Sequence, residues 1–401
     1  MARPWKRLET VLALIALAVG AVIAFVFGLH VYVTSTAETL HPDARRIPST
    51  AAAAPASEWV SAAQRAQAAV RARIVSQNLP GVSVAVGTGR HVVWAEGFGW
   101  ADLETRAVVS PDTRFRIGTA SIPLTSAAAG LLIDRGSLTL DAPIQVYVPE
   151  YPKTTSPVTL RQVMGHVAGL RTDSGDEGPL FGQHCERPAD ALAHIGDPSP
   201  RVAPGSAYRY SRYGFILVSA AIETAAAQPF LRFMRDRVFE PLGMESTRPD
   251  PGDEHGAGQA VSYFPRYSAD PRYGVDSMRS LDYSCYAGSS VFVSTPTDLV
   301  RFGLAINDGT LLKPETVTLL QTPLRLADGK DTGYGLGWDV ETYTLGGAPV
   351  QVVGHDGDLL GGIVSTLLVW RERGLVVAVV SNTSYADTPA IARDVAEAFV
   401  R

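Results

Sequence analysis

The longest apolar stretch of the chain covers residues 11–33, which carry no charge and only two glycines, one histidine and one tyrosine among hydrophobic side chains. As a helix rising about 1.5 Å per residue, this stretch measures roughly 34 Å, enough to cross a hydrocarbon core of about 30 Å. The stub before it, residues 1–10, is basic, whereas Glu38 follows it. Because positive residues stay on the cytoplasmic side, the pattern predicts a single-pass anchor in the inner (cytoplasmic) membrane and a periplasmic main body.

A cleavable signal peptide is the alternative for the same stretch, because Ser35, Thr36 and Ala37 offer a small-residue cleavage site. The apolar run is about twice as long as the hydrophobic region of a usual signal peptide, which favours the anchor. Both alternatives place the bulk of the chain outside the cytoplasm. Residues 34–57 are rich in Ala, Pro and Ser without an apolar period, which predicts a linker.

Beyond the linker, the apolar positions alternate between helical and strand periods. Helical spacing predicts helices at 59–77 and 127–133 and a final helix at 389–400, with Thr388 as its N-cap. Short apolar runs separated by turn residues predict strands. The expected strands are 81–86 and 91–95, which form a hairpin, and 364–370 and 375–381 near the C-terminus.

Composition and charge narrow the class of protein. A chain of 401 residues with 46% hydrophobic residues can bury a large core, as one large domain or two closely packed ones. The net charge of −5 and the lack of a basic motif argue against a nucleic-acid partner. Cys185 and Cys285 are the only cysteines; they either pair in an oxidising compartment or remain two buried thiols. No set of residues at zinc-ligand spacing is present, so neither a metal nor a cofactor is predicted.

Candidate chemistry concentrates at residues 115–125, where a short extended segment leads into the apolar helical run. The start of a buried helix supplies backbone N–H donors and the positive end of the helix dipole, which suit a nucleophile. Thr119 and Ser121 are the hydroxyl residues at this point.

This segment closely resembles the Ser-x-x-Lys segment of the serine β-lactamase and penicillin-binding protein superfamily, in the class C-like branch that includes esterases and mitochondrial β-lactamase-like serine hydrolases. Phe115, Arg116, Ile117, Gly118, Ser121 and Thr125 carry the register. The resemblance implies that Thr119 occupies the nucleophile position and Ile122 the lysine position. Ser121 is the alternative nucleophile. No lysine stands three residues after a serine anywhere in the chain.

Two further segments extend the resemblance. Residues 204–214 resemble the element that carries the general-base tyrosine of this branch, which implies this role for Tyr210, with Ser211 matching and Arg212 replacing a small or amide residue. Residues 352–358 resemble the third motif, His-x-Gly, which lies on a strand lining the cleft and implies a catalytic position for His355. The backbone N–H groups of Thr119 and Asp358 are then the expected oxyanion donors.

His166 lies in a segment, 159–170, that resembles a family element in which the histidine is structural. A catalytic role is the alternative, but no acidic residue stands at a spacing that would form a dyad with it. Structure is therefore the preferred interpretation for His166.

The expected fold is α/β, more narrowly α+β. Two N-terminal and three C-terminal strands enclose a long helical insertion, so the simplest assembly is an antiparallel sheet built from both chain ends and flanked by helices. The resemblance implies the same β-lactamase/transpeptidase fold for residues 58–401, with an α-rich subdomain at about 115–310.

The changed motif leads to two main functional hypotheses, and an exported carrier module unrelated to acyl chemistry is a third possibility. In the first, the catalytic centre is degenerate and the cleft binds a small-molecule or peptide ligand or serves as a scaffold, because Ile122 cannot accept a proton. In the second, the protein hydrolyses esters, amides or peptides through Thr119, with Tyr210 or His355 as base. Asp356 and Asp358 would place two carboxylates at the cleft and repel anionic substrates. Nothing in the sequence indicates an oligomeric state.

Overall fold

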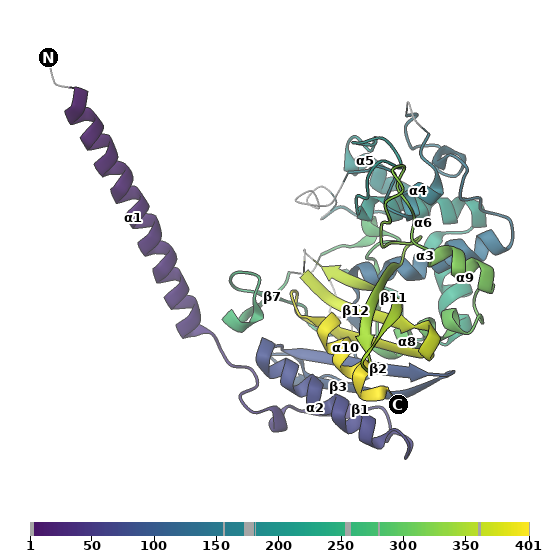
Figure 1. Cartoon of the computed structure of the whole chain (residues 1–401), viewed down its shortest axis with the longest axis horizontal. Coiled ribbons are helices and arrows are strands. Elements are labelled where there is room, and N and C mark those ends of the chain that lie inside the picture. The colour runs from purple at the N-terminus through teal and green to yellow at the C-terminus, as the bar shows by residue number, and fades with distance from the viewer. Residues whose placement is uncertain are drawn as a thin grey trace.

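The computed structural model describes residues 4–154, 157–171, 180, 182–252, 258–279, 281–359 and 362–400. Residues 1–3 of the expected basic stub lie outside this range. Figure 1 shows a long helix, α1, that projects from a two-part body in which one part is built on a sheet and the other on helices.

The main sheet combines strands from both ends of the chain, as the hydrophobic pattern predicted (Figure 1). Its strands pair antiparallel along the whole spatial order. In that order they are β1 (Ser49–Ala51), β3 (His91–Asp102), β2 (Gly81–Thr88), β13 (Leu375–Ser381), β12 (Gly362–Trp370), β11 (Ala348–Leu359) and β10 (Asp339–Leu345), while β4 (Ala107–Val108) pairs with β3.

Smaller strands lie outside the main sheet. They are β5 (Phe115–Arg116), β9 (Phe292–Ser294) and β6 (Arg248–Pro249), which form one sheet, and β7 (Tyr263–Pro265) and β8 (Val275–Ser277), which form a hairpin. The α-helices are α1 (Pro4–Thr36), α2 (Val60–Gln77), α3 (Ser121–Asp134), α4 (Leu160–Met164), α5 (Leu192–Ile195), α6 (Arg212–Ala226), α7 (Phe230–Met234), α8 (Pro296–Asn307), α9 (Pro314–Leu320) and α10 (Thr388–Phe399).

The two faces of the main sheet are covered by different helices. Along β13, Val377 and Val379 belong to a core shared with α2 and α10, whereas Val376 and Ala378 belong to the core shared with α3 and α8. Successive side chains of a strand point to opposite faces, so both faces of β13 are apolar and buried. The second core is the larger one and contains the buried helix α3, which leads away from the candidate site.

The structure corrects two expectations near the sheet edges. Three C-terminal strands were expected, but β10 is a fourth; it was missed because its outward positions are polar, as on many edge strands. The linker expected at 34–57 contains β1, in which Ser49 pairs with Phe98. His41 is also buried, with its Nε2 atom 3.1 Å from the carbonyl oxygen of Pro80. Part of the expected linker is thus packed onto the sheet.

The final helix also begins one residue earlier than expected. Asp387 is its N-cap, because the side chain of Asp387 accepts a hydrogen bond of 3.0 Å from the N–H of Ala390. Thr388 is therefore inside α10 rather than capping it, since a carboxylate three residues before that N–H satisfies the free donor.

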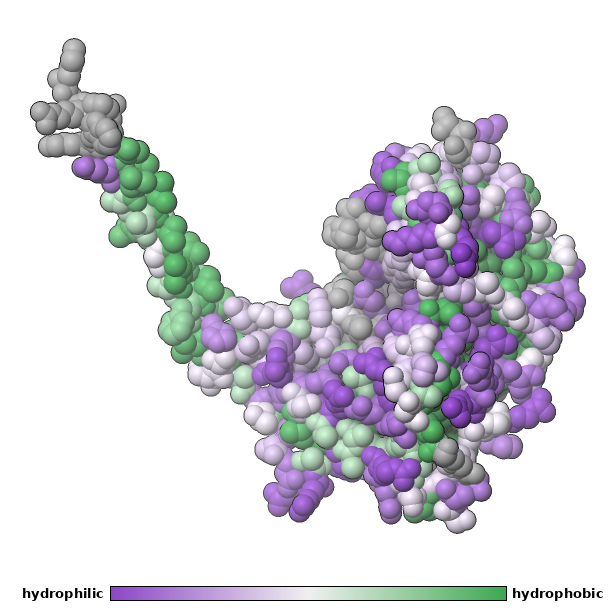
Figure 2. All heavy atoms as spheres, in the orientation of Figure 1, coloured by the Kyte–Doolittle hydropathy of each residue, from purple (hydrophilic) through white to green (hydrophobic). Residues whose placement is uncertain are grey.

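Helix α1 confirms the apolar character of the N-terminal stretch. Its segment Leu8–Thr36 is long and apolar enough to cross a membrane. Figure 2 shows hydrophobic residues along α1, away from the largely hydrophilic surface of the body. Such an exposed apolar surface is stable only when lipid or another apolar partner covers it.

Candidate active site

The candidate site is built around the turn that joins β5 to α3. Gly118, Thr119 and Ala120 form a single 3₁₀ turn, η2 (Gly118–Ala120), and α3 begins directly after it. Gly118 has φ of +51°, and a Cβ atom there would lie 2.1 Å from the carbonyl oxygen of Asp358. Only glycine fits this backbone conformation and this contact, so the turn is pressed against β11.

Neighbouring contacts hold the turn in place from both sides. Arg116 forms an ion pair with Asp250, and both side chains are buried. Ser365 of β12 donates a hydrogen bond of 2.8 Å to the carbonyl oxygen of Ile117. A Cβ atom on Gly357 would lie 2.0 Å from that same oxygen, so the strand and the turn approach as closely as their backbones allow.

The hydroxyl of Thr119 is fully engaged in this contact. It donates a hydrogen bond of 3.0 Å to the carbonyl oxygen of Asp356 and accepts one of 2.9 Å from the N–H of Asp358. The side chain is buried, with 1% of its surface exposed. The Asp358 N–H, one of the two expected oxyanion donors, thus bonds to the protein's own hydroxyl.

The other two residues of the first motif are buried as well. Ile122 is completely buried among the apolar side chains of the main core. Ser121 is also completely buried, and its hydroxyl donates a hydrogen bond of 2.8 Å to the carbonyl oxygen of Gly118. This local bond is typical of a serine in the first turn of a helix.

The second motif lies at the start of α6. Ser211 is the N-cap residue, and its buried hydroxyl has no hydrogen-bond partner within the described ranges. Arg212 is buried, and its guanidinium lies over the ring of Tyr286, 5.7 Å from the ring centre. Tyr210 packs against His166 and His355, with ring centres 4.4 Å and 6.0 Å apart. The structure therefore brings the tyrosine of the second motif and the histidine of the third into one aromatic cluster.

Tyr334 connects the two histidines of this cluster. Its hydroxyl lies 3.3 Å from Nε2 of His166 and 3.1 Å from Nε2 of His355. The Nδ1 atom of His166 accepts a hydrogen bond of 3.2 Å from the N–H of Ser211. The Nδ1 atom of His355 lies 2.7 Å from the carbonyl oxygen of Asp356, which also accepts from Thr119.

These contacts determine which ring nitrogen of His166 and of His355 carries the proton. Because Nδ1 of His166 accepts from a backbone N–H, its proton is on Nε2, which donates to the oxygen of Tyr334. Tyr334 then donates to Nε2 of His355, whose Nδ1–H donates to the Asp356 carbonyl. Burial favours the neutral rings: it lowers the pKa of His166 to about 3 and lowers the pKa of His355 as well. Both nitrogens of His355 are therefore occupied.

Sequence reasoning missed Tyr334, because the Tyr-Gly-Leu-Gly-Trp stretch carries no signal beyond a glycine-rich approach to a strand. The tyrosine is fully buried, and burial raises its pKa well above the usual range. Its partners His166 and His355 lie 168 and 21 residues away in the chain, so no local pattern announces the contact.

The expectation that two carboxylates face the cleft is wrong for Asp356. Its carboxylate accepts a hydrogen bond of 2.7 Å from Thr366, which in turn contacts Thr388 of α10. The side chain therefore lies on the sheet face covered by α10, while only its carbonyl reaches Thr119. A bulge between Gly357 and Asp358 shifts the register of β11 against β12 at this point.

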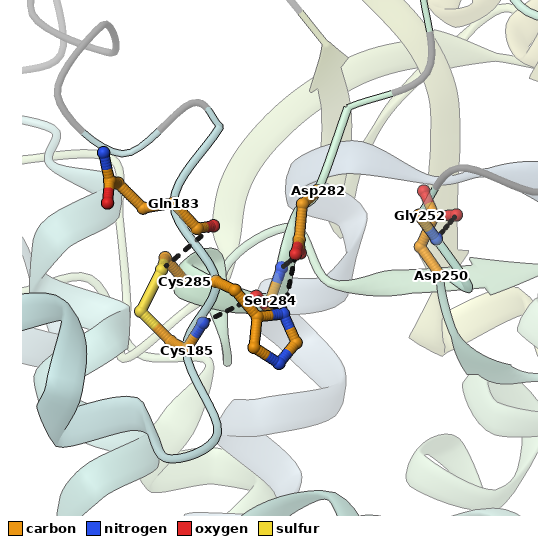
Figure 3. Close-up of polar contacts among 8 residues, drawn as sticks. Gln183, Cys185, Asp250, Gly252, Asp282, Ser284 and Cys285 are labelled. Atoms are coloured by element: carbon orange, nitrogen blue, oxygen red, sulfur yellow. Dashed lines mark hydrogen bonds and ion pairs between the residues drawn. A yellow bond between two sulfur atoms is a disulfide. The ribbon is translucent and has the colours of Figure 1, made fainter.

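A disulfide joins Cys185 and Cys285 (Figure 3), and both cysteines share a core cluster with Tyr213 of the second motif. Around it, the N–H of Cys185 donates to the hydroxyl of Ser284 at 2.9 Å, and the N–H of Ser284 donates to Asp282 at 2.8 Å. Both cysteines belong to a small core cluster with Tyr286, the ring beneath Arg212. The disulfide thus helps to fix the core cluster that contains Tyr286, the ring that Arg212 contacts.

Comparisons with known proteins identify relatives of this chain. The human serine beta-lactamase-like protein LACTB, mitochondrial, is 25% identical over 406 aligned positions, which cover 76% of this chain and 73% of that protein. Penicillin-binding protein 4* of Bacillus subtilis is 24% identical and covers 72% of this chain and 64% of its own length. The D-amino acid amidase from Ochrobactrum anthropi superposes with a TM-score of 0.70 at 22% identity, over 84% of this chain and 98% of the amidase.

The family model described as Beta-lactamase matches residues 63–400, which is nearly the whole body of the protein. The antiparallel sheet, its flanking helices and the helical part agree with the fold that the motifs implied. The chain therefore belongs to the beta-lactamase family, which groups β-lactamase-like serine hydrolases with penicillin-binding proteins.

Proposed function

We propose that the protein is a membrane-anchored, extracytoplasmic member of this family whose centre at Thr119 has lost acyl transfer and now binds a small molecule or peptide, or serves as a scaffold. The main observation behind the proposal is that the hydroxyl of Thr119 is already hydrogen-bonded to the Asp356 carbonyl and to the Asp358 N–H. The replacement of the family lysine by Ile122, buried in the apolar core, supports it.

Acyl transfer needs a nucleophile, an acceptor for its proton and free N–H donors for the developing oxyanion. The proton of Thr119 is directed at the carbonyl oxygen of Asp356, which is a hydrogen-bond acceptor but not a base at neutral pH. Ile122 accepts no proton, and both nitrogens of His355 already have partners. Each requirement would thus need the centre to rearrange first.

Two observations support the proposed location. Helix α1 is long and apolar enough to anchor the chain, and the motifs lie on the part that follows it. The disulfide between Cys185 and Cys285 is typical of an oxidising compartment such as the periplasm.

The test is the intact mass of the full chain in detergent after incubation with a penicillin and, separately, with a fluorophosphonate. Thr119→Ala and Ser121→Ala are run beside it, and an active serine β-lactamase shows that the reagents work. The expected result is no adduct on any form of this protein, with circular dichroism confirming that each sample is folded.

A stoichiometric adduct on the wild type that disappears in Thr119→Ala would overturn the proposal. It would support the alternative function, hydrolysis through Thr119 with Tyr210 or His355 as base. An adduct lost in Ser121→Ala instead would assign the nucleophile to Ser121.

A further inference from the structure

The end of α1 is joined rigidly to a hairpin of the main body. This hairpin, residues 263–277, consists of β7, the 3₁₀ turn η7 (Pro271–Tyr273) and β8. Figure 1 shows β7 near the C-terminal end of α1. The ring of His30 in α1 lies 6.3 Å from that of Tyr267 and 5.9 Å from that of Tyr273, and the two tyrosine rings lie 5.6 Å apart.

Hydrogen bonds fasten the same end of the helix. The guanidinium of Arg266 donates to the carbonyl oxygen and to the hydroxyl of Thr36, both at 3.2 Å. Val33 is 5% exposed, whereas most of α1 is exposed. Four residues after Thr36, the N–H of Leu40 donates to Asn78 of the body at 2.9 Å. Because four residues span at most about 14 Å, the end of α1 stays next to the body.

The length of the helix then determines the depth of the hairpin. The 29 residues of Leu8–Thr36 rise about 43 Å, close to the roughly 40–45 Å of a bilayer with its headgroup layers. His30 lies six residues before the end, which is about 9 Å along the axis. The tyrosines that contact His30 therefore lie near the boundary between headgroups and hydrocarbon, where tyrosine is enriched in membrane proteins.

We propose that the 263–277 hairpin is a second membrane-contacting element, which inserts Tyr267 and Tyr273 into the headgroup layer of the bilayer that α1 spans. This inference rests on the proposed membrane anchor. The hairpin has no net charge, because Arg266 and Arg272 are balanced by Asp270 and Asp276. Arg272 forms an ion pair with Asp270 at 2.6 Å. The hairpin therefore contacts neutral lipid through its aromatic rings and does not depend on anionic lipid.

The hairpin is firmly held on the side of the body, so it is a fixed contact rather than a loose loop. The N–H of Tyr263 donates to the carbonyl oxygen of Asn382 at 2.7 Å, and its hydroxyl accepts from the N–H of Leu103 at 2.8 Å. Phe264 packs edge-on against Tyr385. Together with the anchor, the hairpin would keep the body at one orientation on the membrane.

The test places an environment-sensitive fluorophore on the full chain in phosphatidylcholine vesicles, at Ser268→Cys in the hairpin tip. The native cysteines are paired, so the added thiol is the only reactive one under non-reducing conditions. Ile23→Cys in the middle of α1 and Thr318→Cys on the exposed face of α9 are the controls. Lipids carrying a nitroxide near the headgroup or deep in the acyl chain act as quenchers.

The expected result is strong quenching of the Ser268 probe by the shallow nitroxide, of the Ile23 probe by the deep one, and of the Thr318 probe by neither. Adding phosphatidylglycerol should leave the Ser268 signal unchanged. Replacing Tyr267 and Tyr273 by serine should reduce it several-fold, and replacing them by tryptophan, which also favours the interface, should restore it.

Quenching at Ser268 no stronger than at Thr318, with Ile23 quenched normally, would overturn the hairpin contact and leave the anchor intact. If the deep nitroxide does not quench the Ile23 probe, the proposed anchor is overturned, and this inference with it. Quenching of the Ser268 probe that appears only with phosphatidylglycerol would show that charge attraction, rather than the aromatic rings, brings the hairpin to the membrane. That result would also overturn the inference.

Discussion

The N–H of Asp358 donates a hydrogen bond of 2.9 Å to the hydroxyl of Thr119, across 239 residues of sequence. In an acyl-transfer enzyme this N–H would stabilise the oxyanion of the substrate. Here it stabilises the fold, since it ties β11 to the turn at the start of α3. Under the proposed function, this contact gives Thr119 a structural role in place of a catalytic one.

Thr119→Val tests this structural role directly, because valine keeps the shape of threonine and removes the hydroxyl. The N–H of Asp358 and the carbonyl of Asp356 would both lose their partner, so the free energy of unfolding should fall by about 1–3 kcal/mol. Urea denaturation measures it. Thr119→Ser, which keeps the hydroxyl, should lose clearly less; equal losses would show that only the shape of the side chain matters.

Tyr334→Phe should break the bridge between His166 and His355. The two buried imidazoles would lose the hydroxyl that one donates to and the other accepts from, which is expected to cost about 1–3 kcal/mol of stability. Tyr343→Phe is the matched control, because its hydroxyl bonds to Glu341 at an exposed position of β10. That variant should change stability by less than about 0.5 kcal/mol. Similar effects of the two variants would contradict the bridge.

Acid should destabilise the protein through the buried histidines. Burial lowers the pKa of His166 from 6.5 to about 3, so the unfolded chain binds the proton more readily than the fold does. The stability from the neutral ring is complete above pH 6.5 and is lost as the pH falls towards 3.

His166→Asn is the variant for this prediction, because asparagine tolerates the φ of +55° at this position. Its unfolding free energy, measured between pH 7 and pH 4, should fall less steeply than that of the wild type. An unchanged slope would assign the acid sensitivity to other groups.

Titration of Asp339 should make the protein less stable as the pH rises, which is the opposite of the effect of His166. Burial, followed by the nearby charge of Glu341, raises the pKa of Asp339 from 3.8 to about 7. The fold therefore prefers the protonated carboxyl, and stability is lost as the pH rises from about 4 through 7. Asp339→Asn should then stabilise the protein at pH 8 by about 2 kcal/mol and have little effect at pH 4.

Thermal unfolding at the two pH values measures the difference. Asp276→Asn, which removes an exposed carboxylate on β8, controls for the change in net charge. A gain from Asp339→Asn that is the same at both pH values would exclude the titration of Asp339 as its cause.

Local patterns were sufficient for most of the fold. The hairpin of β2 and β3, the strands β12 and β13 and the long apolar helix all follow from periods that short segments carry. Gly118 stands where a φ of +51° and the contact with Asp358 exclude a side chain. Strand β10 was missed because an edge strand with polar outward residues has no distinctive hydrophobic period.

The sequence by itself determined which residues stand in the segments that resemble catalytic motifs: a threonine at 119, an isoleucine at 122 and a tyrosine at 210. Only the tertiary structure decided what these side chains contact. The bulge at Gly357 and Asp358 sets which groups of β11 face the turn, so that a carbonyl and an N–H meet Thr119 while the Asp356 carboxylate faces α10. Such contacts depend on strand register and on packing between distant segments, which no local pattern encodes.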